Sequence, residues 1–292
     1  MAHKSYNIFN QDGIKFLESL PDNSVDLVLT DPPYITSRDT GMDKWANHIS
    51  NTTEDCKTAA QWLKYKMDNF GGEAWLTHPA QPETRLKELA KLQKNFIKWG
   101  SIYGKKYAVR TNYGDWDSDF TMEKLELFVN HFHRVLRNGG TCIIFFDLWK
   151  ITPLKEQLER AKFKQLRFIE WIKTNPPPIN SKINYLTNAR EIALTAVKKS
   201  KPTFNSKWDK GIYDFPIQGG KERFHPTQKN TKLFKALIEK HSNPGDLVID
   251  PFLGSGTTAV ASLELGRRFG GSELDLDYYN KSKTRIAKYE QM

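Results

Sequence analysis

The sequence has few cysteines and no long hydrophobic run. Cys56 and Cys142 are the only cysteines in 292 residues, which argues against a disulfide framework and favours a reducing, cytoplasmic compartment. The longest apolar run, near 143–146, is far shorter than a membrane-spanning helix. No apolar segment follows the first residues, so we expect neither a secretory signal nor a membrane partner.

Positive charge is in excess. Lys and Arg together number 44 against 34 Asp and Glu, which gives a formal net charge of +10 and a pI near 9.3. This balance favours a polyanionic partner. His131 and His133 lie two residues apart on an expected helix and therefore on different faces, so we predict no metal site.

Apolar runs alternate with amphipathic segments along most of the chain. Helical periodicity is clear over 121–137, for example. Strands that alternate with helices predict an α/β fold with a mostly parallel sheet. The runs with the length and composition of strands lie near 6–9, 25–30, 141–146, 167–173, 190–197, 246–250 and 268–273.

The segment 37–112 differs from this pattern. Tryptophans are scattered among polar residues there, and helices are expected near 58–69 and 83–98. We interpret the segment as a largely helical insertion in a single domain that spans 1–292. Its second half interleaves basic and aromatic residues, which suits a nucleic-acid surface, although a solvated helix face is an alternative explanation.

The tetrapeptide Asp31-Pro32-Pro33-Tyr34 directly follows the apolar run 25–30. Because proline ends a strand, this is a stiff turn at a strand's C-terminal end, where open α/β sheets place their ligands. Neither proline has an N–H group, so the turn offers carbonyl oxygens, a carboxylate and the face of a tyrosine ring. A flat heteroaromatic ring with an exocyclic amino group fits such a pocket. The alternative is a plain strand-ending turn.

A glycine-rich turn lies near the C-terminus. The run 246–250 leads into Gly254 and Gly256, and a helix is expected from Thr257. Glycine lets a ligand approach the backbone, and the helix N-terminus supplies unpaired N–H groups. Glu273 ends the next expected strand about twenty residues further on, the spacing at which a carboxylate takes the ribose hydroxyls of an adenosine cofactor.

Charge near this turn discriminates between adenosine cofactors. Asp250 lies just before it, where a pyrophosphate would be repelled but the sulfonium and ammonium groups of S-adenosylmethionine would not. No lysine follows the turn as a P-loop requires. We therefore favour S-adenosylmethionine. The glycine spacing also satisfies the dinucleotide fingerprint, so an NAD-dependent oxidoreductase is an alternative.

Together these motifs resemble the circularly permuted, beta-group DNA amino-methyltransferases, in which D-P-P-Y precedes F-x-G-x-G. The resemblance covers about 5–36 and 114–290. It implies a seven-stranded, mostly parallel Rossmann-like sheet with helices on both faces, and S-adenosylmethionine as cofactor. The catalytic residues that it implies are Asp31, Pro32, Pro33 and Tyr34. The cofactor-binding residues are Asp12, His225, Thr227, Gln228, Lys229, Asp250, Pro251, Phe252, Gly254, Gly256, Thr257, Thr258 and Glu273. Asp12 also sits where a helix N-cap belongs, which is its alternative role.

The reaction expected from this resemblance is methylation of the exocyclic N6 amino group of adenine in a specific duplex DNA sequence, by base flipping and direct in-line transfer. In this family Asp at the first motif position usually accompanies adenine, whereas Ser usually accompanies cytosine N4, which is the alternative. Cytosine C5 chemistry needs a cysteine nucleophile, typically in a Pro-Cys pair, and no such pair occurs. A catalytically silent DNA-binding protein is the alternative from another class.

Contacts to double-stranded DNA are expected from basic residues in two segments. By motif order the target-recognition segment is 198–224, and the insertion 37–112 is expected to share the task. A homodimer and a cognate restriction endonuclease are further candidate partners. The DNA-binding candidates are Lys105, Lys106, Arg110, Lys198, Lys199, Lys201, Lys207 and Lys210.

Overall fold

The computed structural model describes residues 5–34, 58–70, 82–99, 102, 120–176, 186–220, 223–225 and 227–289. The chain divides into two compact units. The first consists of Met1–Ile35 with Trp116–Met292, and the second is Thr36–Asp115. Each unit is described below by itself.

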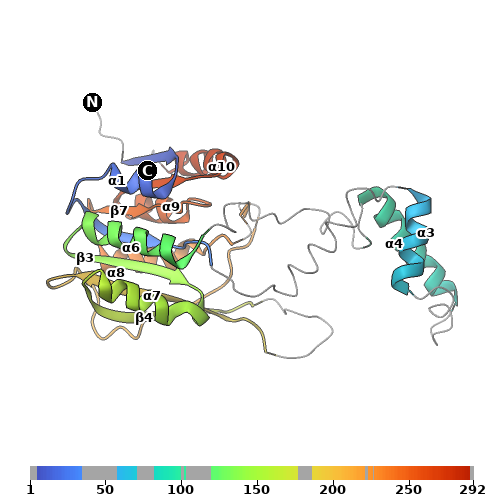
Figure 1. Cartoon of the computed structure of the whole chain (residues 1–292), viewed down its shortest axis with the longest axis horizontal. Helices are drawn as coiled ribbons and strands as arrows, with labels where there is room; N and C mark the ends of the chain where they lie inside the picture. Colours follow the sequence, from blue (N-terminus) through green and yellow to red (C-terminus); the bar gives the residue numbers. More distant parts are fainter. Residues whose placement is uncertain are drawn as a thin grey trace. The chain divides into compact units, whose positions relative to one another are not determined.

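An eight-stranded sheet forms the centre of the first unit (Figure 1). Its order is β1-β8-β7-β2-β3-β5-β4-β6. All neighbouring strands run parallel except β5, which is antiparallel to both β3 and β4. The predicted α/β fold with a mostly parallel sheet is therefore confirmed. The strands are β1 (Tyr6–Asn10), β2 (Val25–Thr30), β3 (Leu136–Phe146), β4 (Phe163–Lys173), β5 (Arg190–Lys198), β6 (Ile212–Phe215), β7 (Leu247–Asp250) and β8 (Arg268–Glu273).

The expected number of seven strands is wrong, because β6 adds an eighth at one edge. It pairs in parallel with the second half of β4. Only four residues long and carrying Asp214 at its centre, it offers neither an apolar run nor a clear alternation. Pairing with β4 rather than local sequence makes it a strand.

Helices cover both faces of this sheet (Figure 1). On one face α1 (Gly13–Glu18), α6 (Met122–Val135) and α7 (Ile151–Arg160) pack against side chains such as Val28 and Ile144. On the other, α8 (Thr231–His241), α9 (Thr257–Glu264) and α10 (Leu276–Ala287) pack against neighbours such as Leu29 and Ile143. Consecutive strand residues thus point to opposite faces, and both faces are buried, which explains why the central strands are continuous apolar runs.

The described part of the second unit is helical. It contains α3 (Ala59–Phe70) and α4 (Pro82–Trp99). Trp62 packs against Phe96 with ring centroids 5.4 Å apart, and Leu89 and Ile102 complete a small core. Among the described helices of both units, none has the length and apolar character needed to span a membrane.

Candidate active site

The two motif turns follow strands that are neighbours in the sheet. β2 pairs in parallel with β7, and the chain leaves these strands at Thr30 and Asp250. Parallel strands bring their carboxyl ends to one edge, so the D-P-P-Y turn and the glycine turn lie in adjacent positions. β3 is also parallel to β2 and ends at the same edge, which we call the carboxyl edge.

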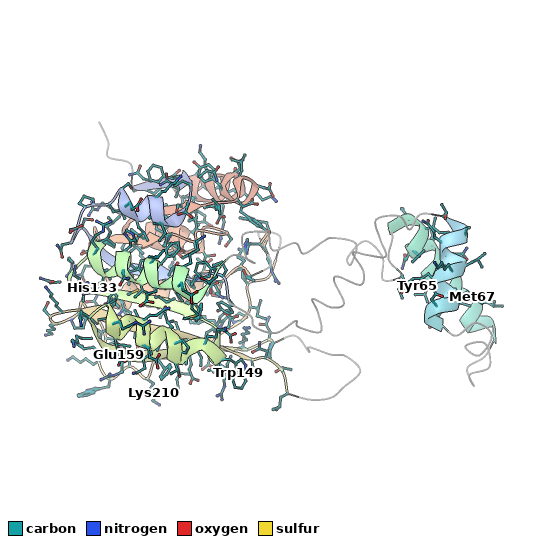
Figure 2. All side chains as sticks on the ribbon, in the orientation of Figure 1. Tyr65, Met67, His133, Trp149, Glu159 and Lys210 are labelled. Atoms are coloured by element: carbon teal, nitrogen blue, oxygen red, sulfur yellow. The ribbon has the colours of Figure 1, made fainter. Side chains whose placement is uncertain are left out.

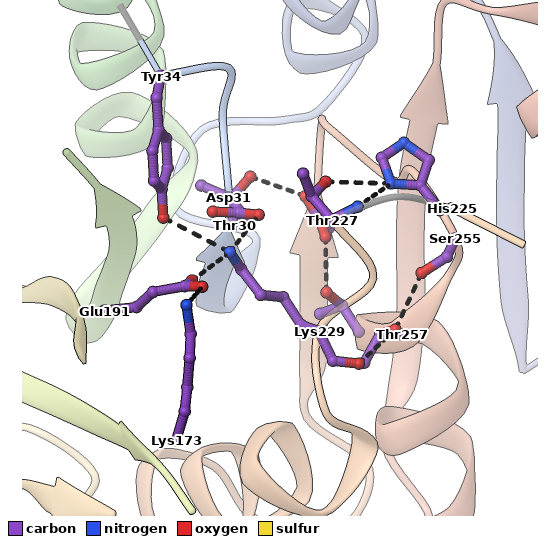
Figure 3. Close-up of polar contacts among 12 residues, drawn as sticks. Thr30, Asp31, Tyr34, Lys173, Glu191, His225, Thr227, Lys229, Ser255 and Thr257 are labelled. Atoms are coloured by element: carbon purple, nitrogen blue, oxygen red, sulfur yellow. Dashed lines mark hydrogen bonds and ion pairs between the residues drawn. The ribbon is translucent and has the colours of Figure 1, made fainter. Parts of the chain in front are cut away.

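Lys229 occupies the centre of this edge (Figure 3). Its Nζ atom lies 2.9 Å from Oδ2 of Asp31 and 2.6 Å from Oε2 of Glu191. The same atom is 3.5 Å from the hydroxyl of Tyr34 and 5.4 Å from the centre of that ring. Lys173 donates to the other oxygen of Glu191 at 2.8 Å. The Tyr34 ring in turn meets Phe146 edge-on, with centroids 6.0 Å apart.

Burial and charge together set the protonation of these groups. Burial raises the pKa of Asp31 to about 6, and the positive charge of Lys229 limits that rise. Burial acts on Glu191 in the same direction, but Lys229 and Lys173 overcome it and lower the pKa of that carboxyl. Burial would lower the pKa of Lys229, yet Asp31 and Glu191 raise it well above the ordinary value. At neutral pH the site therefore holds two carboxylates and at least one buried ammonium group.

Glu191 and Lys173 were not predicted as site residues. Glu191 is the second residue of β5, and Lys173 is the last residue of β4. Because β5 is antiparallel to β3, its first residues lie at the carboxyl edge. Charged residues at the ends of the two expected strands were the available signal, but they become informative only once the direction of β5 is known.

The glycine turn follows β7 and leads into α9. Gly254 and Gly256 have φ values of 51° and 75°, a region that glycine adopts without strain. The backbone N–H of Gly254 donates to Oε2 of Glu273 at 2.7 Å, and the N–H of Asp275 donates to Oε1 at 2.9 Å. Glu273 is thus held at the end of β8 with lone pairs left on both oxygens. Since a Cβ on Gly254 would meet nothing closer than 3.8 Å, the turn leaves room for a ligand against its backbone.

Asp250 does not face this space, which corrects the prediction made from the sequence. Its Oδ1 accepts from the hydroxyl of Thr30 at 2.7 Å and from the N–H of Phe252 at 3.0 Å. Its Oδ2 accepts from the hydroxyl of Thr258 at 2.6 Å. The side chain is 3% exposed. Asp250 therefore ties the two motif strands to α9, and its carboxylate is not placed to contact a cofactor.

Other predicted cofactor residues also have internal roles. The Thr257 hydroxyl lies 3.0 Å from that of Ser255 and accepts from Arg285. Phe252 packs against Phe128 with the rings tilted and their centroids 4.5 Å apart. Pro251 accepts a hydrogen bond from Ser272 through its carbonyl oxygen.

The segment before α8 approaches the glycine turn through His225. Its Nε2 would be 3.9 Å from a Cβ on Gly254, and its ring packs on Tyr278 at 4.4 Å between centroids. Thr227 lies against the other ring nitrogen of His225, and the Gln228 side chain accepts from the backbone of Phe224. Burial lowers the pKa of His225 to about 4, so this ring is neutral at physiological pH.

Asp12 acts as the N-cap of α1. Its Oδ1 accepts from the backbone N–H of Ile14 at 2.8 Å, which agrees with the alternative role given by the sequence. Nearby, Asn10 at the end of β1 donates to the carbonyl oxygen of Glu273 at 2.8 Å. Asp12 thus follows shortly after Asn10, the residue at the end of β1 whose side chain binds the backbone of Glu273.

The predicted DNA contacts at 198–201 lie at the opposite edge of the sheet. Val197 pairs with Thr141, which lies in the middle of β3. Trp149 follows the end of β3, and Figure 2 shows it on the other side of the first unit from His133, in the last turn of α6. Lys198 is 6% exposed and donates to Asn23 at 2.9 Å. Its ammonium group is used internally, which does not favour the predicted contact of Lys198 with DNA.

The segment that follows stays at that opposite edge. The backbone N–H of Asn205 donates to the carbonyl oxygen of Lys240, in the last turn of α8, at 2.8 Å. Asp209, which separates Lys207 from Lys210, pairs with the Lys240 ammonium group. Only the end of 198–224, after β6, approaches the carboxyl edge. Lys105, Lys106 and Arg110 fall outside the described residues.

The fold and this edge place the chain among α/β proteins with a mostly parallel, Rossmann-like sheet, and comparison with known proteins identifies the family. A family model described as DNA methylase, covering N6 and N4 enzymes, matches residues 25–284. The chain belongs to this family of DNA methyltransferases.

Individual relatives agree with this assignment. Type II methyltransferase M2.MboI of Moraxella bovis is 28% identical over 296 residues, covering 97% of this chain and 88% of its own. Type II methyltransferase M2.DpnII of Streptococcus pneumoniae is 33% identical over 197 residues, covering 61% of this chain and 73% of its own. The chain is thus similar to restriction-modification methyltransferases along nearly its whole length.

Solved structures share the fold. The complex of M1.HpyAVI with SAM matches with a TM-score of 0.60 at 21% identity, covering 96% of this chain and 98% of that one. PvuII DNA methyltransferase, a cytosine-N4-specific enzyme, also gives 0.60, at 14% identity, covering 99% of this chain and 94% of that one. At these identities the matches establish the fold alone.

Proposed function

We propose that this DNA methyltransferase transfers a methyl group from S-adenosylmethionine to the N6 amino group of adenine in a specific duplex sequence. One observation carries the proposal: the acceptor-rich turn at Asp31 and the glycine turn at Gly254 lie at the ends of paired strands. A target amino group held by the first turn would be next to a cofactor held by the second. S-adenosylmethionine is the methyl donor, and it supplies a methyl group on a positively charged sulfur.

The residues at the glycine turn suit this cofactor. Glu273 offers carboxylate oxygens to ribose hydroxyls, and the open space at Gly254 lets the cofactor lie against the backbone. The guanidinium group of Arg285 is engaged within the protein, since it donates to the carbonyl oxygen of Ser255 at 2.9 Å and to the hydroxyl of Thr257 at 3.2 Å. A nicotinamide dinucleotide would bring a pyrophosphate to a turn whose adjacent groups are Glu273 and a neutral His225.

The D-P-P-Y turn holds the target base. The Asp31 carboxylate and the Pro32 carbonyl oxygen accept the two amino hydrogens, which directs the nitrogen lone pair towards the methyl group. Tyr34 stacks on the base, and such stacking is worth about 1 to 3 kcal/mol per base. Extruding a base from the duplex costs a few kcal/mol, so the stacking offsets much of it. Positioning supplies much of the rate enhancement.

Adenine is favoured over cytosine by Asp rather than Ser at the first motif position. The fold does not discriminate, since a cytosine-N4-specific enzyme shares it. The product therefore has to be identified directly.

The helical unit supplies a surface suited to the DNA backbone. Leu89 and Phe96 lie on the buried face of α4, whereas Lys87, Lys91 and Lys94 are exposed. Together with Lys98 they recur at intervals of four, three and four residues, which places them along one helix face. We call these four residues the lysine stripe. A row of cations of this kind suits phosphates without specifying sequence.

We also propose two protein partners, a cognate restriction endonuclease and a second copy of this chain in a homodimer. The relatives M2.MboI and M2.DpnII carry Type II methyltransferase names, and a cognate restriction endonuclease would fit an enzyme of that type. A homodimer is the second.

The test is incubation of the protein with S-adenosylmethionine and unmethylated duplex DNA, followed by digestion to nucleosides and mass spectrometry. N6-methyladenine is the expected product. N4-methylcytosine would keep the mechanism and overturn the base assignment. Absence of any methylated nucleoside, with cofactor binding verified by calorimetry, would overturn the proposed reaction.

A further inference from the structure

Four charged side chains of alternating sign are connected in a row beneath the D-P-P-Y turn. Asp31 contacts Lys229, Lys229 contacts Glu191, and Glu191 contacts Lys173, at 2.9, 2.6 and 2.8 Å respectively (Figure 3). We call them the ion chain. They come from four separate segments: the turn after β2, the segment before α8, and the ends of β5 and β4. Their formal charges sum to zero.

The ion chain is largely removed from water. The side chains of Lys229 and Lys173 are 8% and 12% exposed, and those of Glu191 and Asp31 are 18% and 19% exposed. Buried ion pairs cost desolvation energy that their attraction often fails to repay, so they are weak evidence for a stabilising role. Four such groups ending at a proposed catalytic carboxylate indicate a functional role instead.

The two oxygens of Asp31 have different surroundings. Oδ2 is bound by Lys229. Oδ1 is buried, and no described residue hydrogen-bonds to it. A buried acceptor without a partner is costly and calls for an explanation, because most buried polar atoms in folded proteins are satisfied. An amino group on the substrate would donate a hydrogen bond to Oδ1 and so satisfy this oxygen.

The Lys229 side chain is directed at Asp31 and Tyr34 rather than at the cofactor turn. Its ammonium group also lies 5.6 Å from the centre of the Phe145 ring, near the end of β3. Lys229 contacts the glycine turn only through its backbone, whose carbonyl oxygen accepts a 3.4 Å hydrogen bond from Thr257. The sequence motif predicts that Lys229 binds the cofactor, but its ammonium group is directed at Asp31, Glu191 and Tyr34 instead.

We propose that Lys229, held by Glu191 and through it by Lys173, is the positioning residue that keeps Asp31 ionised with Oδ1 turned towards the target amino group. The proposal rests on the amino-methyl transfer proposed above. A protonated Asp31 would have one oxygen acting as a donor, and it could then no longer offer its full acceptor capacity to an amino group. Lys229 prevents this by occupying Oδ2 and stabilising the charge.

The ion chain makes a prediction that distinguishes positioning from simple structural support. The charged and titratable groups facing Asp31 are Lys229, Glu191 from β5, and Tyr34 from its own turn. Lys229 lowers the pKa of Asp31 and Glu191 raises it. Removing the two charges one at a time must therefore move the ionisation of Asp31 in opposite directions. Loss of structural support would harm both variants in the same way.

The experiment measures kcat against pH for Lys229→Met and Glu191→Gln, with saturating S-adenosylmethionine and duplex DNA. The acid limb of the profile is expected to move up by about one pH unit or more in Lys229→Met. In Glu191→Gln it is expected to move to lower pH. The KM for S-adenosylmethionine is expected to stay within about twofold in both variants, since neither side chain contacts the cofactor turn, and Lys229→Arg is expected to restore the acid limb.

Lys232→Met is the matched control, because Lys232 is an exposed residue of the first turn of α8. Its profile is expected to coincide with that of the wild type. Glu191→Gln preserves side-chain volume and carries the test by itself if Lys229→Met fails to fold. Acid limbs that move in the same direction, or not at all, would overturn the proposal. A wild type that transfers no methyl group would overturn the proposed function and this inference with it, so the two failures are distinguishable.

Discussion

The hydroxyl group of Thr30 donates a 2.7 Å hydrogen bond to Oδ1 of Asp250 and so joins the ends of the two motif strands. The other oxygen of Asp250 accepts from Thr258 in the first turn of α9. One buried carboxylate thus fixes the D-P-P-Y turn relative to the glycine turn, the two turns proposed to hold the target base and the cofactor. In-line transfer depends on that relationship, because a displacement of about 1 Å between reacting groups can cost about 10²-fold in rate.

The first prediction concerns the pH dependence of stability. Burial raises the pKa of Asp250 to about 6, whereas an unfolded aspartate titrates near about 3.9. Between these values the folded state binds more protons than the unfolded state, so the unfolding free energy falls as pH rises. The decrease amounts to about 3 kcal/mol for a shift of about two units. We expect Asp250→Asn to lose this component, as measured by urea denaturation across that pH range. Parallel curves for variant and wild type would contradict it.

The second prediction separates chemistry from binding at Asp31. Asp31→Ala removes the carboxylate that accepts an amino hydrogen, so kcat is expected to fall by about 10²-fold or more, by analogy with the loss of one preorganised hydrogen-bonding group elsewhere. Binding of S-adenosylmethionine, followed by calorimetry, and of duplex DNA, followed by fluorescence anisotropy, should largely survive. Asp214→Ala is the control, since Asp214 is an exposed aspartate of β6. Full activity in Asp31→Ala would remove Asp31 from the mechanism.

Much of the fold could be predicted because its central strands are buried on both faces. The second half of β3 is an uninterrupted apolar run and β2 is apolar apart from Asp26 and its last residue, Thr30, and such runs are recognisable without any knowledge of their partners. β6 could not be recognised, since four residues with a central aspartate form a strand only by pairing with β4. Its existence is a property of the tertiary structure.

The site residues that could be predicted are those that lie at the carboxyl ends of parallel strands. Asp31 and Glu273 each lie at the end of a parallel strand, so their meeting at one edge could be inferred. Glu191 and Lys198 lie at the two ends of β5, and the antiparallel direction of that strand decides which of them reaches the site. Because direction cannot be read from composition, Glu191 was missed, and Lys198 was given as a DNA contact although its end of β5 lies away from the carboxyl edge.

The third prediction compares the two glycines of the cofactor turn. A Cβ on Gly256 would lie 3.0 Å from Cδ1 of Ile286, whereas one on Gly254 would meet no atom closer than 3.8 Å. Both positions have positive φ, so alanine costs about 1 to 2 kcal/mol of backbone strain at either. Gly256→Ala should lose additional unfolding free energy through the contact with Ile286. Gly254→Ala should instead show a weaker affinity for S-adenosylmethionine, because its methyl group enters the space left for the ligand. Urea denaturation and calorimetric titration of both variants make the comparison, and unchanged cofactor affinity in Gly254→Ala would contradict it.

The last prediction tests the lysine stripe of α4. Replacing Lys87, Lys91 and Lys94 with glutamine removes three exposed positive charges from one helix face. If each contacts a phosphate, the slope of log affinity against log salt should decrease by about 0.9 per lost contact. DNA affinity at low salt should fall, while the affinity for S-adenosylmethionine should not change.

The matched control for the stripe is Lys199→Gln combined with Lys201→Gln, since both residues are exposed at the edge of the sheet opposite the site. Anisotropy titrations of a labelled duplex at several salt concentrations measure all the slopes. An unchanged slope in the stripe variant, or an equal decrease in the control, would show that α4 does not follow the DNA backbone. A decrease confined to the stripe variant would assign the helical unit a contact with the DNA backbone.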